Sequence, residues 1–129
     1  MEINQAQSTF LLVLVIAFLA VVYILIFGPS GHIRKGREAE AKRLENKIRV
    51  GGGLELINDF MELARAYVKL GRNSDAESAM RKALAMAENE YGKKSERLAP
   101  VIKTYAWVLA RSNRTVEAEN MRKRIKDLS

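Results

Sequence analysis

Residues 54–91, LELINDFMELARAYVKLGRNSDAESAMRKALAMAENEY, decide the fold of the carboxy-terminal part of this chain. Apolar residues recur there at three- and four-residue spacing in two runs, which predicts two amphipathic helices separated by Gly71-Arg72-Asn73. Asn73 or Ser74 is expected to cap the second helix, where Ser74 and Glu77 fit a capping box. The apolar positions are Leu56, Ile57, Phe60, Leu63, Ala64, Tyr67 and Val68 in the first run, and Ala76, Ala79, Met80, Ala83, Leu84 and Ala87 in the second.

The following residues predict a second pair of helices. The third helix should begin near Ser95 or Glu96 and end near Arg111, with Pro100 in its first turns, where a missing amide is tolerated. Thr115 should cap a fourth helix that continues almost to the end of the chain. Since no stretch alternates with a period of two, we predict an all-α fold.

The two pairs repeat each other. A shift of 42 residues places LARAYVKLGRNSDAESAMRKALAM over YAWVLARSNRTVEAENMRKRIKDL. This repeat resembles the tetratricopeptide repeat (TPR), in the longer variety found in kinesin light chains, and implies two TPR-like helical hairpins over residues 54–129. Asn113 replaces the family's turn glycine, and Arg122 stands where a large apolar residue is usual. The signature matches are Phe60, Leu63, Ala64, Tyr67, Gly71, Ala76, Met80 and Ala83, then Ile102, Tyr105, Ala106, Leu109 and Ala118.

In the resembled family, the first helices of successive repeats line a groove that takes a peptide or a partner helix. Carried onto this chain, the groove candidates are Asn58, Met61, Arg65, Val68, Lys103, Trp107 and Ala110. Arg65 and Lys103 would favour an acidic partner. Trp107, the only tryptophan, is either an interface residue or part of the core.

The other decisive stretch is an apolar run, FLLVLVIAFLAVVYILIF, from Phe10 to Phe27. At about 1.5 Å per residue a helix of this length nearly matches the hydrocarbon core of a bilayer, so residues 1–30 are interpreted as a tail and a single transmembrane anchor spanning about 9–27. Gly28-Pro29 should end the span. A cleaved signal peptide is disfavoured, because no basic residue precedes the run and no small-residue cleavage motif follows it.

Charge gives the orientation. Only Glu2 is charged before residue 31, whereas residues 31–50 are rich in Lys and Arg, which are retained on the cytoplasmic side. We therefore expect a single-pass protein with its amino terminus outside and its carboxy-terminal domain cytoplasmic, in a membrane such as the bacterial inner membrane. The same basic residues could attract anionic lipid, and this candidate membrane-surface patch comprises Arg34, Lys35, Arg37, Lys42 and Arg43.

Residues 31–53 form a basic juxtamembrane helix followed by a hinge at Gly51-Gly52-Gly53. Its apolar stripe of Ile33, Ala41, Leu44 and Ile48 is compatible with a stalk, a helix lying on the membrane, or a helix packed on the repeats. Because two repeats rarely bury a continuous core alone, either this helix or a partner should complete the array.

The sequence argues against an enzyme. Cysteine is absent, His32 is the only histidine, and no phosphate-binding loop or metal-ligand spacing is present. We therefore expect no cofactor, no metal and no small-molecule substrate, and the dispersed basic residues do not predict nucleic-acid binding.

Binding to proteins remains. The leading hypothesis is a membrane-anchored TPR scaffold, an accessory subunit that docks a protein partner on the cytoplasmic face of a larger membrane complex. The alternatives are a receptor for soluble client peptides and a surface protein that binds anionic membrane lipid.

Overall fold

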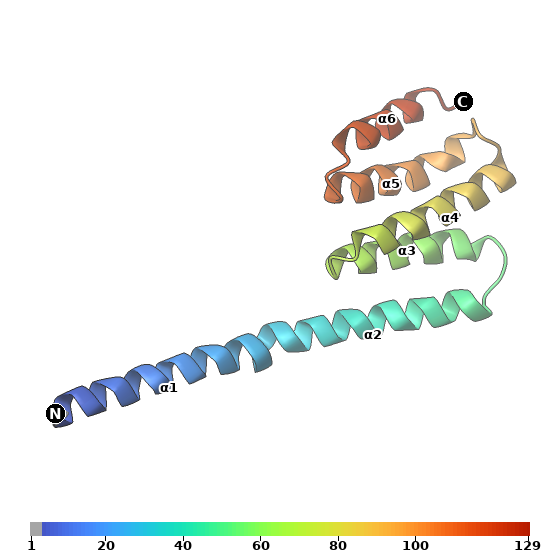
Figure 1. The fold of residues 1–129 in the computed structure, drawn as a ribbon. Helices are drawn as coiled ribbons and strands as arrows, with labels where there is room; N and C mark the ends of the chain where they lie inside the picture. The colour runs from blue at the N-terminus through green and yellow to red at the C-terminus, as the bar shows by residue number, and fades with distance from the viewer. Residues whose placement is uncertain (1–3) are drawn as a thin grey trace. The chain divides into compact units, whose positions relative to one another are not determined.

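The computed structural model describes residues 4–129, and two compact units make up the chain, the first ending at Gly36 and the second running from Arg37 to Ser129. No strand occurs among the described residues, which confirms the predicted all-α class. The helices are α1 (Gln5–Phe27), α2 (Pro29–Val50), α3 (Glu55–Lys69), α4 (Asn73–Tyr91), α5 (Ala99–Arg111) and α6 (Thr115–Lys126), with a 3-10 turn, η1 (Glu96–Leu98), before α5 (Figure 1).

Helix α1 contains the whole apolar run, and its large apolar side chains are exposed on every side. It is long and apolar enough to cross a membrane. The helix ends as predicted: Gly28 is extended, and Pro29 begins α2. A Cβ atom at Gly28 would lie 2.1 Å from the Ile24 carbonyl oxygen, so the break requires glycine.

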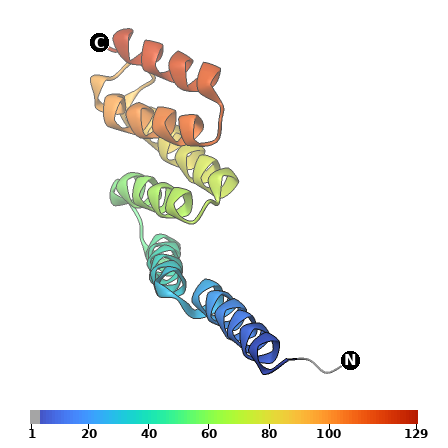
Figure 2. The ribbon, with the colours of Figure 1, turned by 90° about the vertical axis from the view of Figure 1, so that its left-hand side faces the viewer.

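The second unit is an array of antiparallel helices that begins within α2. In both Figure 1 and Figure 2, residues 37–50 of α2, then α3, α4, α5 and α6 lie beside one another in chain order. Ala41 and Leu44 are buried in the common core, and Ile48 packs against it. From Arg37 onward α2 is therefore packed on the repeats, whereas Ile33, in the first unit, is 55% exposed.

The packing of α2 supplies the additional helix that two repeats need to bury a continuous core. Helix α2 covers one end of the array, while α6 closes the other with exposed polar side chains such as Glu119 and Lys123. Ala64, Ala76 and Ala118 have no exposed surface, so small residues occupy the helix crossings. Of the two predicted ways to complete the core, the structure has the first, in which α2 packs on the repeats.

The turns inside the two hairpins share one backbone conformation. Gly71 has φ 75° and Asn113 has φ 60°, and both positions therefore need a left-handed backbone. The amide of the next residue reaches back to the helix end in each turn, Arg72 to the Tyr67 carbonyl at 2.9 Å and Arg114 to the Leu109 carbonyl at 2.9 Å. Asparagine tolerates this conformation, which explains why Asn113 can replace the turn glycine.

The predicted helix caps are partly wrong. Neither Ser74 nor Thr115 caps a helix, because α4 already begins at Asn73 and α6 at Thr115, without side-chain caps. The left-handed turn residue brings Arg72 and Arg114 to the position before each helix instead. The predicted start of the third helix near Ser95 or Glu96 is the start of η1, where the Ser95 hydroxyl accepts a hydrogen bond from the Arg97 amide at 3.3 Å, and α5 itself begins at Ala99.

Candidate protein-docking surface

Helices α3 and α5 present a mostly polar face to solvent. Its residues step by three or four positions along each helix, so their side chains share one side. We define the α3–α5 face by its exposed members, which are Asn58, Glu62, Arg65, Lys69, Lys103, Trp107 and Arg111.

One hydrogen bond joins the two halves of this face. The Arg65 guanidinium donates to the Thr104 hydroxyl oxygen at 3.2 Å, and that hydroxyl donates to the Pro100 carbonyl at 3.0 Å. Thr104 is buried in the first half of α5, three residues before Trp107. The Arg65 side chain therefore lies across from α3 onto α5, and exposed groups of the two helices form one surface.

Trp107 is the aromatic centre of the face. It is 37% exposed, so it is neither a core residue nor fully solvated. The Arg111 guanidinium lies 5.7 Å from the centre of its ring, within the range of a cation–π contact. The Arg111 guanidinium restricts the motion of the Trp107 ring, and the exposed part of the ring is an apolar surface that a partner can bury.

The predicted groove residues divide by burial. Asn58, Arg65, Lys103 and Trp107 are exposed, and Val68 and Ala110 are partly buried beside them. Met61 is 7% exposed and belongs to the core, so it contributes no surface. Sequence reasoning omitted Glu62, Lys69 and Arg111, although the spacing of four residues between Trp107 and Arg111 was a usable signal.

Basic residues dominate the charge of the α3–α5 face. Arg65, Lys69, Lys103 and Arg111 stand against Glu62 alone. None of these five residues takes part in the salt bridges that fasten the helices together. Their charges are therefore available to an approaching ligand, and the face favours an acidic one.

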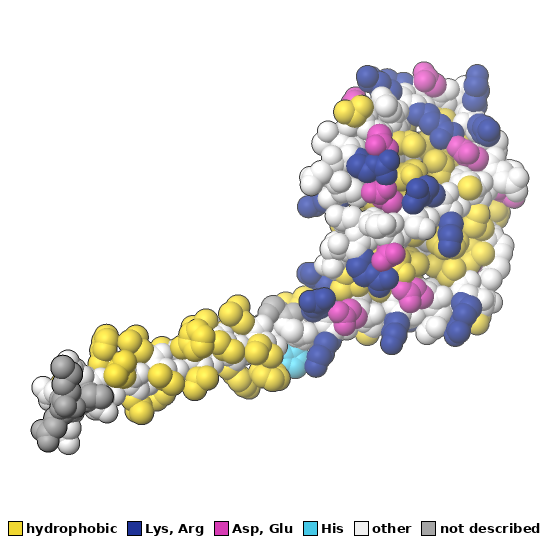
Figure 3. Space-filling view, viewed as in Figure 1, with side chains coloured by type: hydrophobic (Ala, Val, Ile, Leu, Met, Phe, Trp, Pro, Cys, Tyr) yellow, Lys and Arg dark blue, Asp and Glu magenta, His cyan; other side chains and the backbone are white. Residues whose placement is uncertain are grey.

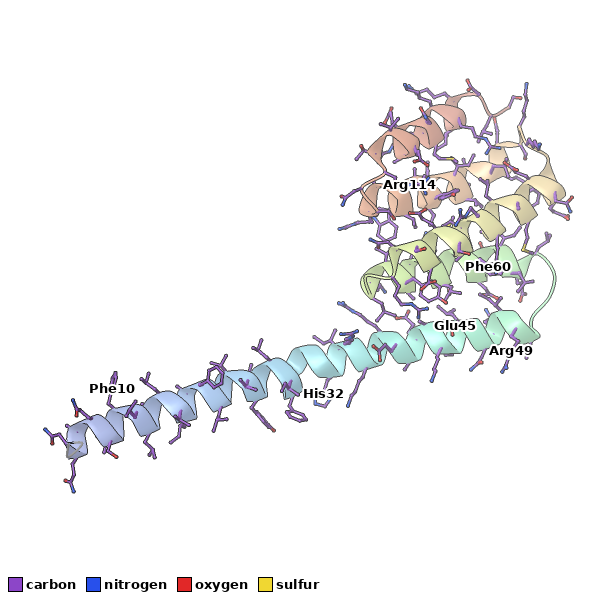
Figure 4. The ribbon with its side chains drawn as sticks, viewed as in Figure 1. Phe10, His32, Glu45, Arg49, Phe60 and Arg114 are labelled. Carbon is purple, nitrogen blue, oxygen red and sulfur yellow. The ribbon has the colours of Figure 1, made fainter. Side chains whose placement is uncertain are left out.

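Outside the α3–α5 face, salt bridges and hydrogen bonds between α2 and α3 hold α2 to the array. The Lys47 ammonium lies 2.6 Å from the buried Asp59 carboxylate. The Tyr67 hydroxyl donates at 2.5 Å to Glu45, which is labelled on α2 in Figure 4. Burial raises the pKa of Tyr67 to about 12, with the hydrogen bond to Glu45 adding to the shift. The hydrogen bond to Asp59 raises the pKa of Lys47. These contacts make residues 37–50 part of the folded unit.

A second polar contact fastens the repeats to each other. Arg114, at the start of α6, pairs with Glu77 of α4 and with Glu117 three residues on. Arg72 has the same place at the start of α4, 2.7 Å from Asp75 and 4.0 Å from Glu45 of α2. Arg114 thus links α6 to α4, and Arg72 links α4 to α2.

The predicted basic patch is divided between the two units. Arg34 and Lys35 belong to the first unit, and Arg37, Lys42 and Arg43 to the second. Arg37 donates to the Lys69 carbonyl at 3.0 Å, at the carboxy-terminal end of α3, and so helps to hold α2. Lys42 and Arg43 are exposed.

The potential metal ligands are dispersed over the described part of the chain. Within residues 4–129, no three His, Asp or Glu side chains lie close enough together to hold a metal ion. His32 is exposed. A cavity of about 280 Å³ beside Leu54, Ile57 and Met86 is lined by ordinary core and surface residues. Figure 3 shows acids interspersed with Lys and Arg over the visible face of the second unit.

Comparison with known proteins agrees with the architecture. The family model of the tetratricopeptide repeat matches residues 57–127, which begin within the first turn of α3, include α4, α5 and α6, and exclude α1 and α2. Searches of curated proteins and of solved structures gave no match. The match therefore comes from the pattern of repeats rather than from one relative.

Proposed function

The chain belongs to the tetratricopeptide-repeat family, and we propose that it is a membrane-anchored scaffold whose α3–α5 face docks an acidic segment of a protein partner. Repeats of this family mediate protein–protein interaction and are generally not enzymes. The partner would be part of a larger membrane complex, on the cytoplasmic side.

The α3–α5 face is the observation that carries this proposal. The face combines an aromatic anchor, Trp107 with Arg111 over its ring, with the exposed positive charges of Arg65 and Lys103. Tryptophan and arginine are the residue types most enriched where interface energy is concentrated. Opposite charge on the partner would speed association and select the orientation.

Helix α1 supports the anchoring part. Its apolar residues from Phe10 to Phe27 are exposed in the described structure, and so large an apolar surface needs a lipid or protein cover. The Lys and Arg residues that follow support a cytoplasmic location for the repeats.

Docking is tested by purification from membranes solubilised in mild detergent. We expect Trp107→Ala to weaken capture of the partner by about 2 kcal/mol or more, as loss of an interface anchor does. Arg65→Glu should also weaken capture if the partner is acidic. The matched control is Arg122→Glu, because Arg122 is exposed on α6, outside the α3–α5 face.

The outcome distinguishes the hypotheses. Capture that survives Trp107→Ala but is lost with Arg122→Glu would move the docking surface to α6. Circular dichroism of each variant shows whether the fold persists, and an unfolded Trp107→Ala variant would assign Trp107 to the core. A stoichiometric membrane protein supports the scaffold, whereas exchanging soluble peptides would support a client receptor.

Orientation is tested with carboxy-terminal reporters. A fluorescent protein that folds only in the cytoplasm should be active when fused after Ser129, and an export-dependent phosphatase at the same point should be inactive. The reverse pattern would place the repeats outside.

A further inference from the structure

The packing of α2 on the array fixes which of its side chains face outward. Ala41, Leu44 and Ile48 point into the core at spacings of three and four residues. The opposite face must therefore be formed by residues displaced by half a turn. Those residues are Ala39, Lys42, Arg43, Asn46, Arg49 and Val50, and all are exposed.

This outer stripe of α2, residues 39, 42, 43, 46, 49 and 50, carries three positive charges and no negative one. The acid at position 45 is turned toward the array, where it accepts from Tyr67. Figure 4 labels Glu45 on the side of α2 near α3 and Arg49 on the side away from it. Folding therefore turns Glu45 toward the array and leaves a basic stripe on the outside of α2, with the exposed acids Glu38 and Glu40 beside it.

The charges of this stripe are not used by the fold. Lys42 and Arg43 make no hydrogen bond or ion pair with another residue in the described part of the chain. Arg49 donates only to the neutral Asn46 side chain, at 3.2 Å. By contrast, Arg37 is engaged with the Lys69 carbonyl. The outer stripe thus differs from the patch predicted from sequence, because it lacks Arg34, Lys35 and Arg37 and adds Arg49.

We propose that the outer stripe of α2 binds the anionic phospholipid headgroups of the membrane that α1 crosses. This inference rests on the anchoring part of the proposed function. Lys42 follows the apolar run by about four helical turns, so only a short stretch of chain links the stripe to the span, which raises its effective concentration at the headgroups. Gly28 ends the helical backbone of α1 before α2 begins.

A membrane is favoured over an acidic protein for two reasons. The stripe lies on the exposed face of a single helix, and a row of charges along one helix suits a charged surface better than a peptide. Its apolar members, Ala39 and Val50, are separated by three turns and give a protein partner no central anchor. The stripe also leaves the α3–α5 face free, so lipid contact and docking are compatible.

The chain contains no cysteine, which allows a direct test with single labels on the full-length protein. A fluorophore at Ala39→Cys reports on the outer stripe of α2, and one at Asn120→Cys on α6 is the matched control. The protein is reconstituted into phosphatidylcholine vesicles with or without phosphatidylglycerol, each containing a headgroup-linked quencher. Flotation of the vesicles shows separately whether the chain is anchored.

We expect quenching at position 39 to rise with phosphatidylglycerol and to fall at high salt, while position 120 changes little. Lys42→Glu with Arg43→Glu should lower the population in contact by at least fivefold for each basic residue lost. Lys123→Glu with Lys126→Glu on α6 is the control for net charge.

Equal quenching at position 39 in neutral and anionic vesicles would overturn the lipid proposal while leaving the anchor intact. Indifference to Lys42→Glu with Arg43→Glu would overturn it too. If vesicles float without the chain, the anchor itself fails and the lipid proposal fails with it. Loss of a co-purified protein in the Lys42→Glu, Arg43→Glu variant, without any quenching, would make the stripe a protein surface instead.

Discussion

Leu44→Ala tests whether residues 37–50 are part of the folded array. Leu44 is 2% exposed, and the change removes three carbon atoms from the contact between α2 and the core. At about 0.8 kcal/mol for each buried CH₂ group, the lost transfer free energy is about 2.4 kcal/mol. Cavities raise the cost of such changes to about 2–5 kcal/mol, and α2, as an outer helix, can settle into part of the space. We therefore expect a loss of about 2–3 kcal/mol.

The assay is thermal unfolding of the full-length protein in detergent, followed by the fluorescence of Trp107. Because Trp107 is the only tryptophan and lies in α5, its signal reports on the array and not on α1. For a domain of 60–100 residues, 1 kcal/mol shifts Tm by roughly 4–8 °C, so Leu44→Ala should lower Tm by roughly 8–24 °C.

The matched control is Val50→Ala on the same helix, since Val50 is 81% exposed and its truncation should leave Tm nearly unchanged. An unchanged Tm for Leu44→Ala, or an equal fall for both variants, would refute the packing of α2 and return residues 31–50 to a free stalk.

Two further predictions concern the repeats. Ala76 has no exposed surface, so Ala76→Leu should overpack the crossing of α3 and α4 and cost about 1–3 kcal/mol in chemical denaturation, whereas Ala85→Leu on the exposed side of α4 should not; equal stability of both variants would contradict the repeat packing. The raised pKa of Tyr67, about 12 in the folded state against 10.0 ordinarily, means that the folded state holds this proton more tightly. This contribution to stability is complete below pH 10 and is lost as the pH rises through 12, so Tyr67→Phe should lessen the fall of stability in that range. Part of the fall should remain, because burial also raises the pKa of Tyr105. A Tyr67→Phe variant whose stability falls as steeply at alkaline pH as that of the unmodified protein would refute the assignment.

The four helices of the repeats could be predicted from sequence because their causes are local. Apolar spacing along α3 and α4 marks the buried face, and Gly71 marks a left-handed turn residue. The apolar run of α1 and its end at Gly28 are visible for the same reason. Ala64 and Ala76 could be assigned to helix crossings because the repeat aligns them with Ala106 and Ala118.

The positions of single side chains depended on neighbours distant in sequence. Met61 has the spacing of a surface residue on α3, yet it is buried by the surrounding helices. Ser74 and Thr115 are residue types that often cap helices. After the left-handed turns, however, the helices begin earlier than predicted, and Arg72 and Arg114 occupy the positions before α4 and α6.

The sequence alone determined that this chain has one long apolar helix and a TPR array, because helix periodicity and chain composition are properties of short segments. Only the tertiary structure decided that α2 closes the array, with Lys47 on Asp59 and Glu45 on Tyr67. Only the tertiary structure, too, separated the basic residues that hold helices together from those that face outward. A charged side chain on one helix often pairs with a residue on another helix, and the residue spacing along a single helix does not specify which helices lie next to each other.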